Sequence, residues 1–133
     1  MKNFDVQAIE INVPANLAWG YIADPAALPD WTSAFSQASH GCAVLNTPNG
    51  TVSIGLKVEA SEAHGTIDWV MSFPDGSVAR AYSRVTALDE RRCVYGFVLL
   101  PPPVPLEQLE GALAAQSQTL AKELKKLKTL LER

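Results

Sequence analysis

The stretch NVPANLAWGYIADPAALPDW, from Asn12 to Trp31, decides the fold of this chain. Pro14 suits the start of a helix, because the N–H that proline lacks would have no partner there. The predicted helix must end at Asp24, because the residue before Pro25 is pushed out of the α-helical region. The residues that remain before Trp31 allow at most one further turn. The stretch therefore predicts two short helices with a break between them.

The composition is that of an ordinary globular chain. Hydrophobic residues make up 47% of the 133 residues and charged residues 19%, and a chain of this length buries roughly two-thirds of its unfolded surface. We expect one domain over residues 1–133. The formal net charge of -3 argues against a nucleic-acid partner, because phosphate binding needs a concentrated basic face.

Hydropathy gives no sign of a membrane or export segment. No apolar run approaches the ~20 residues needed to cross a bilayer. The N-terminal residues alternate between polar and apolar types, which is unlike a signal peptide. The sequence therefore predicts a cytoplasmic protein without a transmembrane segment.

A two-residue alternation of apolar and polar side chains predicts about six strands joined by tight turns. Short strands connected in this way form an antiparallel meander. The predicted strands cover residues 4–13, 37–45, 51–61, 66–73, 77–88 and 93–100.

The same alternation predicts which side chains point inward. On the strand over 77–88, the small residues Ala79, Ala81 and Ser83 suit an interior better than Arg80 and Arg84, because buried arginines need partners. The large inward side chains predicted on the other strands are Ile54, Leu56, Ile67, Trp69, Met71, Tyr95 and Phe97.

A long C-terminal helix is predicted from about residue 106 to 132, after the proline-rich segment 101–105 ends all sheet pairing. Its apolar stripe is marked by leucines at helical spacing, among them Leu109, Leu113, Leu120, Leu124 and Leu127. Gln116 is the one polar residue on that stripe near its middle. It points either into the interior or to the surface, and we predict the interior.

The sequence contains no recognisable catalytic or metal-binding motif. His40 and Cys42 are too few to make a zinc site, and two cysteines are too few for a disulfide framework. Neither a nucleophile elbow nor a phosphate-binding loop appears. The predicted inward faces offer no pair of carboxylates for acid–base work. We therefore expect no metal and no cofactor, and we assign no catalytic residue.

The order of strand, two short helices, antiparallel meander and long terminal helix resembles the START-like superfamily, also called SRPBCC. This superfamily includes the polyketide cyclase/dehydrase and lipid-transport families. The resemblance is carried by INVPANLAWGYIADPAALPDW, from Ile11 to Trp31. It covers essentially the whole chain and implies an α+β helix-grip fold. In that fold a curved antiparallel sheet of about six strands wraps the C-terminal helix, and the two short helices after strand 1 close one end.

The resemblance also implies a pocket between the sheet and the C-terminal helix, and the predicted inward side chains make that pocket mostly apolar. We expect it to bind a small hydrophobic ligand such as a lipid, a polyketide or an aromatic metabolite. The alternatives are a polyketide cyclase/dehydratase-like enzyme or hydrolase on the same scaffold, a module that acts through protein contacts, and a closed core without a ligand. A monomer or a homodimer is expected. The candidate ligand-binding residues are Trp31, Phe35, Trp69, Met71, Ser83, Tyr95, Phe97, Leu113 and Gln116.

Overall fold

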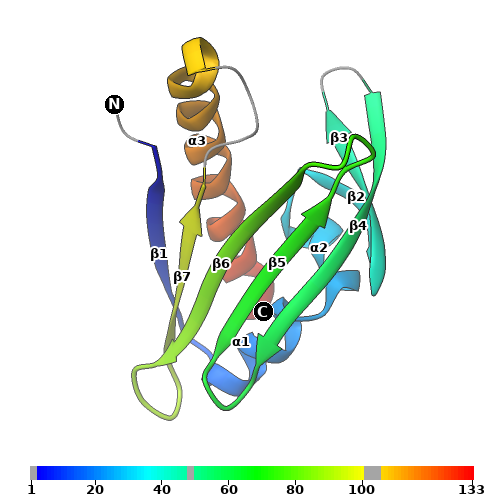
Figure 1. Ribbon diagram of the computed structural model, residues 1–133. Coiled ribbons are helices and arrows are strands. Elements are labelled where there is room, and N and C mark those ends of the chain that lie inside the picture. The colour runs from blue at the N-terminus through cyan, green and yellow to red at the C-terminus, as the bar shows by residue number, and fades with distance from the viewer. Residues whose placement is uncertain (1–2, 48–49, 101–105) are drawn as a thin grey trace.

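A curved antiparallel sheet packs around one long helix in the computed structural model of the chain (Figure 1). The structure describes residues 3–47, 50–100 and 106–133, with the side chains of 47 and of 106–112 outside that description. The elements in chain order are β1 (Asp5–Ile11), α1 (Ala15–Ile22), η1 (Pro25–Ala27), α2 (Leu28–Trp31), β2 (Phe35–Ser39), β3 (Gly41–Thr47), β4 (Gly50–Ser61), β5 (Thr66–Ser72), β6 (Val78–Ala87), β7 (Cys93–Leu99) and α3 (Leu106–Leu131).

The predicted helix-grip class is confirmed, but the sheet has seven strands where about six were predicted. Their order is β1-β7-β6-β5-β4-β3-β2, and every neighbouring pair is antiparallel. The single strand predicted over 37–45 is a hairpin of β2 and β3, in which Ser39 pairs with Cys42. Gly41 makes the tight turn with φ 97°, a conformation open to glycine. His40 lies in this turn, so it does not share a strand face with Cys42.

The predicted break after the first short helix is confirmed, but η1 and α2 together occupy the stretch before Trp31, where at most one further turn was predicted. Pro14 directly precedes α1, and Asp24 separates α1 from η1. The Asp24 Oδ1 atom accepts the backbone N–H of Ala26 at 3.0 Å, which satisfies a helix-start donor that would otherwise lack a partner. Trp19 Nε1 donates to the carbonyl oxygen of Thr66 at 3.2 Å. The opening helices are thereby attached to the start of β5.

The inward faces of the strands were predicted correctly. On β6, Ala81 and Ser83 are buried whereas Arg80 and Arg84 are exposed. The core lies between the sheet and the helices, and its larger strand residues include Ile11, Ile54, Leu56, Ile67, Trp69, Val85, Tyr95 and Phe97.

The leucine stripe of α3 faces the interior as predicted, because a 3.6-residue period returns its members to one side of the helix. The buried members are Leu113, Leu120, Leu124 and Leu127. The predicted burial of Leu109 concerns a side chain outside the described set, and the proline-rich segment 101–105 also lies outside the described residues.

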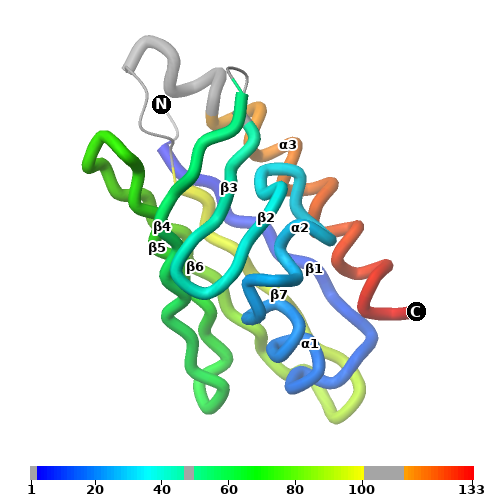
Figure 2. Tube along the Cα trace, turned by 90° about the vertical axis from the view of Figure 1, so that its right-hand side faces the viewer, coloured from blue at the N-terminus to red at the C-terminus, as the bar shows by residue number. Residues whose placement is uncertain are grey.

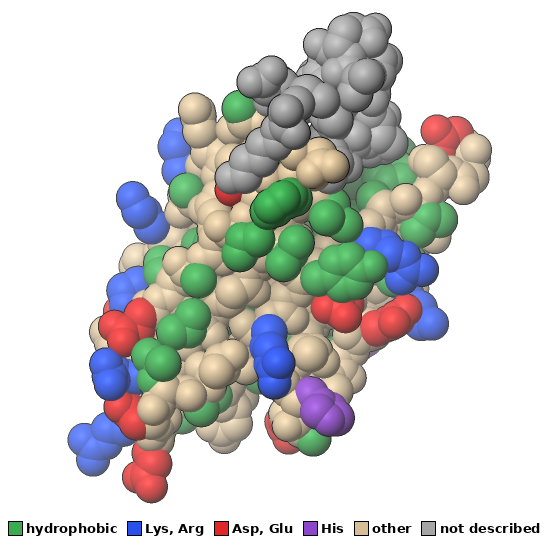
Figure 3. Space-filling view, turned by 60° about the vertical axis from the view of Figure 1, so that its left-hand side comes forward, with side chains coloured by type: hydrophobic (Ala, Val, Ile, Leu, Met, Phe, Trp, Pro, Cys, Tyr) green, Lys and Arg blue, Asp and Glu red, His purple; other side chains and the backbone are tan. Residues whose placement is uncertain are grey.

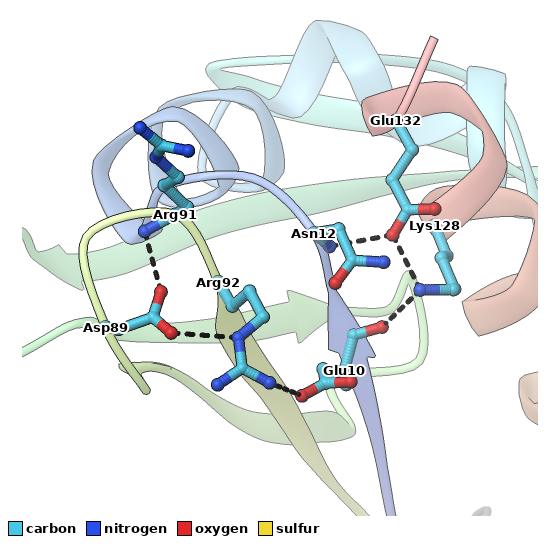
Figure 4. A network of polar contacts seen from close by, with 7 residues as sticks. All are labelled: Glu10, Asn12, Asp89, Arg91, Arg92, Lys128 and Glu132. Atoms are coloured by element: carbon cyan, nitrogen blue, oxygen red, sulfur yellow. Dashed lines mark hydrogen bonds and ion pairs between the residues drawn. The ribbon is translucent and has the colours of Figure 1, made fainter.

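Polar contacts attach the C-terminal end of α3 to β1 (Figure 4). Lys128 Nζ donates to the backbone oxygen of Glu10 at 2.8 Å and pairs with Glu132 Oε2 at 2.6 Å. The same Glu132 oxygen accepts the backbone N–H of Asn12 at 2.7 Å. Arg92, at the start of β7, reaches Glu10 Oε1 at 3.0 Å. The contacts of Lys128 and Glu132 hold the C-terminal end of α3 against β1 and the residue that follows it, and the Arg92–Glu10 pair joins the β6–β7 turn to β1.

Candidate ligand-binding cavity

The curved sheet and the helices leave a cavity of about 1050 Å³ between them. Strands β2, β3, β5, β6 and β7 form its walls together with α2 and α3, and Figure 2 shows α2 near α3 on one side of the sheet. A cavity of this size can enclose a drug-sized molecule. Its apolar lining includes Leu28, Leu45, Met71, Phe73, Ala81 and Leu99.

The structure brings six of the nine candidate ligand-binding residues together in this lining. They are Trp31, Phe35, Trp69, Met71, Phe97 and Gln116. The described lining does not include Ser83, Tyr95 or Leu113, all of which are buried. Gln116 is exposed to solvent, so it lies at the mouth of the cavity and not in its interior.

Four aromatic rings form a continuous cluster, of which Trp31, Trp69 and Phe97 line the cavity and Tyr95 lies behind them. Trp31 on α2 meets the edge of Tyr95 at a centroid distance of 6.3 Å and an interplanar angle of 86°. Tyr95 meets Phe97 at 6.3 Å and 72°, and Phe97 stacks on Trp69 at 5.9 Å. Edge-to-face and offset-stacked pairs of this kind are the favoured geometries for aromatic rings. The cluster gives the cavity a rigid apolar wall.

Three polar atoms of this cluster are buried without a hydrogen-bond partner among the described residues. They are Trp31 Nε1, Trp69 Nε1 and the Tyr95 hydroxyl. Burial raises the pKa of Tyr95 far above its usual value, because a low-dielectric interior disfavours the phenolate. The Ser83 hydroxyl donates to the carbonyl oxygen of Ile67 at 2.5 Å. The Ser83 hydroxyl is thus satisfied by the backbone, and Ser83, a predicted ligand-binding residue, is outside the described lining.

Glu123 is a polar residue of the lining that the sequence analysis did not find. Its Oε2 atom accepts the backbone N–H of Ser33 at 2.6 Å and the Ser33 hydroxyl at 3.2 Å. Asn46 Nδ2 donates to the Ser33 carbonyl oxygen at 3.1 Å. Burial raises the pKa of Glu123, and the hydrogen bonds from Ser33 partly oppose this shift. Glu123 therefore joins α3 to the segment between α2 and β2 at the edge of the cavity.

The spacing of Glu123 contained a signal for this position. Gln116, Leu120 and Glu123 follow one another at i, i+4 and i+7, which places them on one face of a helix. Glu123 was not among the predicted site residues, because it stands next to lysines in the run KELKK, a charge pattern typical of a solvated helix face.

Other parts of the surface are less suited to a small ligand. A shallow depression of about 450 Å³ lies over β3 to β5, at His40, Gly41, Gly55, Lys57 and Ser72. Hydrophobic side chains gather in the middle of the face drawn in Figure 3, with charged side chains toward its sides.

Among the described residues no group of His, Cys, Asp and Glu has the arrangement of a metal site. No helix in the described part of the chain is long and apolar enough to span a membrane.

Comparison with known proteins finds likeness in structure only. No family model matches the sequence, and no curated protein matches it. The fold matches a START superfamily protein from Mycobacterium smegmatis with a TM-score of 0.70 and 14% identity, covering 97% of this chain and 99% of that chain.

Two further solved structures show the same likeness. The Zhui aromatase/cyclase from Streptomyces sp. R1128 matches with a TM-score of 0.67 and 14% identity, over 98% of this chain and 93% of that one. The protein XoxI from Bacillus cereus matches with a TM-score of 0.71 and 14% identity, over 98% of this chain and 96% of that one. The chain therefore has the START-like, or SRPBCC, fold.

Proposed function

We propose that this protein binds a small, largely apolar ligand, such as a lipid, a polyketide or an aromatic metabolite, in the cavity between the sheet and α3. The observation that carries the proposal is the cavity of about 1050 Å³ with its mainly apolar lining. A chain that needed only a stable core would gain from filling such a space, because an empty apolar volume forfeits packing contacts.

The small side chains on β6 also support the proposal. Ala79 and Ala81 line the cavity, where larger side chains would occupy the space that a ligand needs. The fold is shared with a START superfamily protein and an aromatase/cyclase. A fold alone does not determine a function. This likeness therefore supports a ligand-binding scaffold but does not identify the ligand.

The test adds each member of a panel of fatty acids and planar aromatic compounds to the protein. Tryptophan fluorescence and thermal unfolding of the protein are measured with each compound. Trp31 and Trp69 both line the cavity, so an occupant should change their emission. A ligand at about 100 times its dissociation constant should add about 2.7 kcal/mol to the free energy of unfolding. If no member of the panel changes either signal, the proposal is wrong.

A pair of matched variants locates the binding site. Ala81→Phe places a ring in the cavity and should weaken every ligand that binds there. Ala87→Phe makes the same substitution on the same strand, at an exposed residue outside the described lining, and should leave binding unchanged. Equal effects of both variants would place the ligand elsewhere.

The enzyme alternative is favoured by one observation, the carboxyl of Glu123 in the cavity lining. An acid–base catalyst needs a pKa moved toward the working pH, and burial moves the pKa of Glu123 in that direction. Such an enzyme would be a polyketide cyclase/dehydratase-like protein or a hydrolase. Its test is turnover of a bound ligand, which Glu123→Gln should abolish while binding persists.

The chain is further proposed to form one domain, to be cytoplasmic, and to occur as a monomer or homodimer. Cell fractionation checks the location, and sedimentation of the purified protein checks the assembly.

A further inference from the structure

The charge distribution in the cavity indicates what kind of polar group a ligand carries. Among the lining residues that the structure describes, Glu123 is the only carboxylic acid and Arg80 is the only basic residue. Arg80 is exposed, on the β6 face that also presents Arg84 to solvent, whereas Glu123 is only partly exposed. A charge that is partly withdrawn from water acts more strongly on a neighbouring charge than one in full contact with solvent. The Glu123 carboxylate should therefore act more strongly on a ligand in the cavity than the Arg80 guanidinium does.

The hydrogen bonds of Glu123 leave part of the accepting capacity of its carboxylate available. Both bonds from Ser33 end on Oε2. The Ala34 backbone N–H also acts on this carboxylate, in the direction that lowers its pKa. A carboxylate has about four acceptor sites on its two oxygens, so Glu123 can accept a further donor from a ligand.

The surroundings of this carboxylate suit an organic cation. Ser33 lies two residues after Trp31 and two before Phe35, and both of these aromatic residues line the cavity. Aromatic rings attract cations through the negative face of the π system. An occupant of the cavity therefore meets these aromatic side chains in the same lining as the Glu123 carboxylate. A cation paired with Glu123 would also offset the cost of burying that negative charge.

We infer that the cavity takes an amphipathic organic amine, whose protonated nitrogen pairs with the Glu123 carboxylate while its apolar body lies against the aromatic wall. This inference rests on the proposed function and narrows it to one ligand class. Two cationic groups would repel a bound amine, Lys126 on α3 and Arg80 on β6. Lys126 is exposed, and its attraction lowers the pKa of Glu123 less than burial raises it.

The experiment compares three probes that share one ring system: naphthylethylamine, naphthylethanol and naphthylacetate. Calorimetric titration of the wild-type protein at neutral pH should show the amine binding about tenfold or more tightly than the alcohol, with the acetate weakest. In Glu123→Gln the amine should fall to within about twofold of the alcohol. Glu90→Gln removes the same charge from the exposed β6–β7 turn and should keep the preference for the amine.

A second measurement needs no variant. The preference of the wild-type protein for the amine over the alcohol should decline as the pH falls through the pKa of Glu123, because the protonated carboxyl no longer pairs with a cation. The alcohol should bind equally at every pH.

The inference is overturned if the wild-type protein binds the alcohol or the acetate as tightly as the amine. It is also overturned if the preference for the amine over the alcohol survives Glu123→Gln, or if the ratio of the amine affinity to the alcohol affinity does not depend on pH. Equal binding of all three probes would leave the proposed function standing and remove only the inference. Failure of these probes and of the whole ligand panel to bind would overturn both.

Discussion

The Glu123 carboxylate on α3 accepts two hydrogen bonds from Ser33, one from the backbone N–H at 2.6 Å and one from the hydroxyl at 3.2 Å. The two residues are 90 positions apart in the chain. Their contact joins the C-terminal helix to the segment that follows α2, and both residues line the cavity. Its strength should therefore affect the stability of the protein and the shape of the binding site.

The first prediction concerns the pH dependence of stability. Burial raises the pKa of Glu123 in the folded protein above its ordinary value of 4.5. The stability that this group contributes is then fully present below the unfolded pKa and is lost as the pH rises through the folded pKa. Glu123→Gln removes this dependence. As the pH rises from about 4.5 through the raised pKa of Glu123, the wild-type free energy of unfolding should decline relative to that of the variant.

Urea denaturation at a series of pH values measures this difference. Glu90→Gln, at an exposed residue, serves as the control and should follow the wild-type protein. A difference that stays constant would show that the Ser33 hydrogen bonds balance the effect of burial, and a change in the opposite direction would show that they outweigh it; either result contradicts the prediction.

The second prediction concerns the glycine before β5. Gly65 has φ 74° and its carbonyl oxygen accepts the Val85 N–H at 2.8 Å, so a Cβ atom at Gly65 would collide with the Val85 carbonyl. Gly76 has φ 90° but no atom within 4 Å of such a Cβ. Gly76→Ala should cost roughly 1–2 kcal/mol for its backbone conformation alone. Gly65→Ala should cost more, about 3 kcal/mol or above, because the backbone must also move.

Chemical denaturation of both variants tests this comparison. Equal losses for the two alanine variants would mean that the backbone near Val85 gives way without cost.

The third prediction concerns Gln116, which lines the cavity and is exposed. Gln116→Leu should leave the fold intact, because the residue is not part of the buried core. It should weaken a ligand with a hydrogen-bonding head by about 1 kcal/mol, the low end of the range for a lost partner, because water can replace an exposed amide. Titration of one such ligand and of its methylated analogue checks the effect. An equal change for both compounds would remove Gln116 from ligand recognition.

The fourth prediction concerns the thiols. Both cysteines are free, Cys42 exposed and Cys93 buried, and burial raises the pKa of Cys93. Because the thiolate is the reactive form, a thiol reagent should titrate Cys42 rapidly in the native protein and Cys93 only after unfolding. Denatured, unreduced protein should show two reactive groups. Rapid reaction of both in the native state would mean that β7 opens readily.

Local sequence patterns predicted much of the fold. Alternation placed Ala81 and Ser83 inside and Arg80 outside on β6, because successive strand side chains point to opposite faces. Pro14 and Pro25 marked the two ends of α1, because the steric restrictions of proline are local and apply in any tertiary context. The hairpin of β2 and β3 was predicted as one strand, because its turn has only His40 and Gly41 to mark it.

The candidate site was predicted less completely, because a cavity depends on which elements meet. The alternation identified Trp69, Met71 and Phe97 as inward, and all three line the cavity. The alternation also predicted that Tyr95 points inward, but Tyr95 lies behind the other rings, is 0% exposed and is not in the described lining. Period alone cannot distinguish a side chain that reaches an internal space from one that is sealed off by its neighbours.

The sequence by itself determined the order of the elements, the inward face of each strand and the leucine stripe of α3, since these follow from local sterics and from burial of apolar surface. Only the tertiary structure decided that Glu123 lies in a cavity. Its burial requires the segment at Ser33 to cross α3 and to supply donors to its carboxylate. Helical spacing puts Glu123 on the same face as Gln116 and Leu120, but it does not show which segment meets that face, because the contact with Ser33 depends on how the sheet curves around the helix.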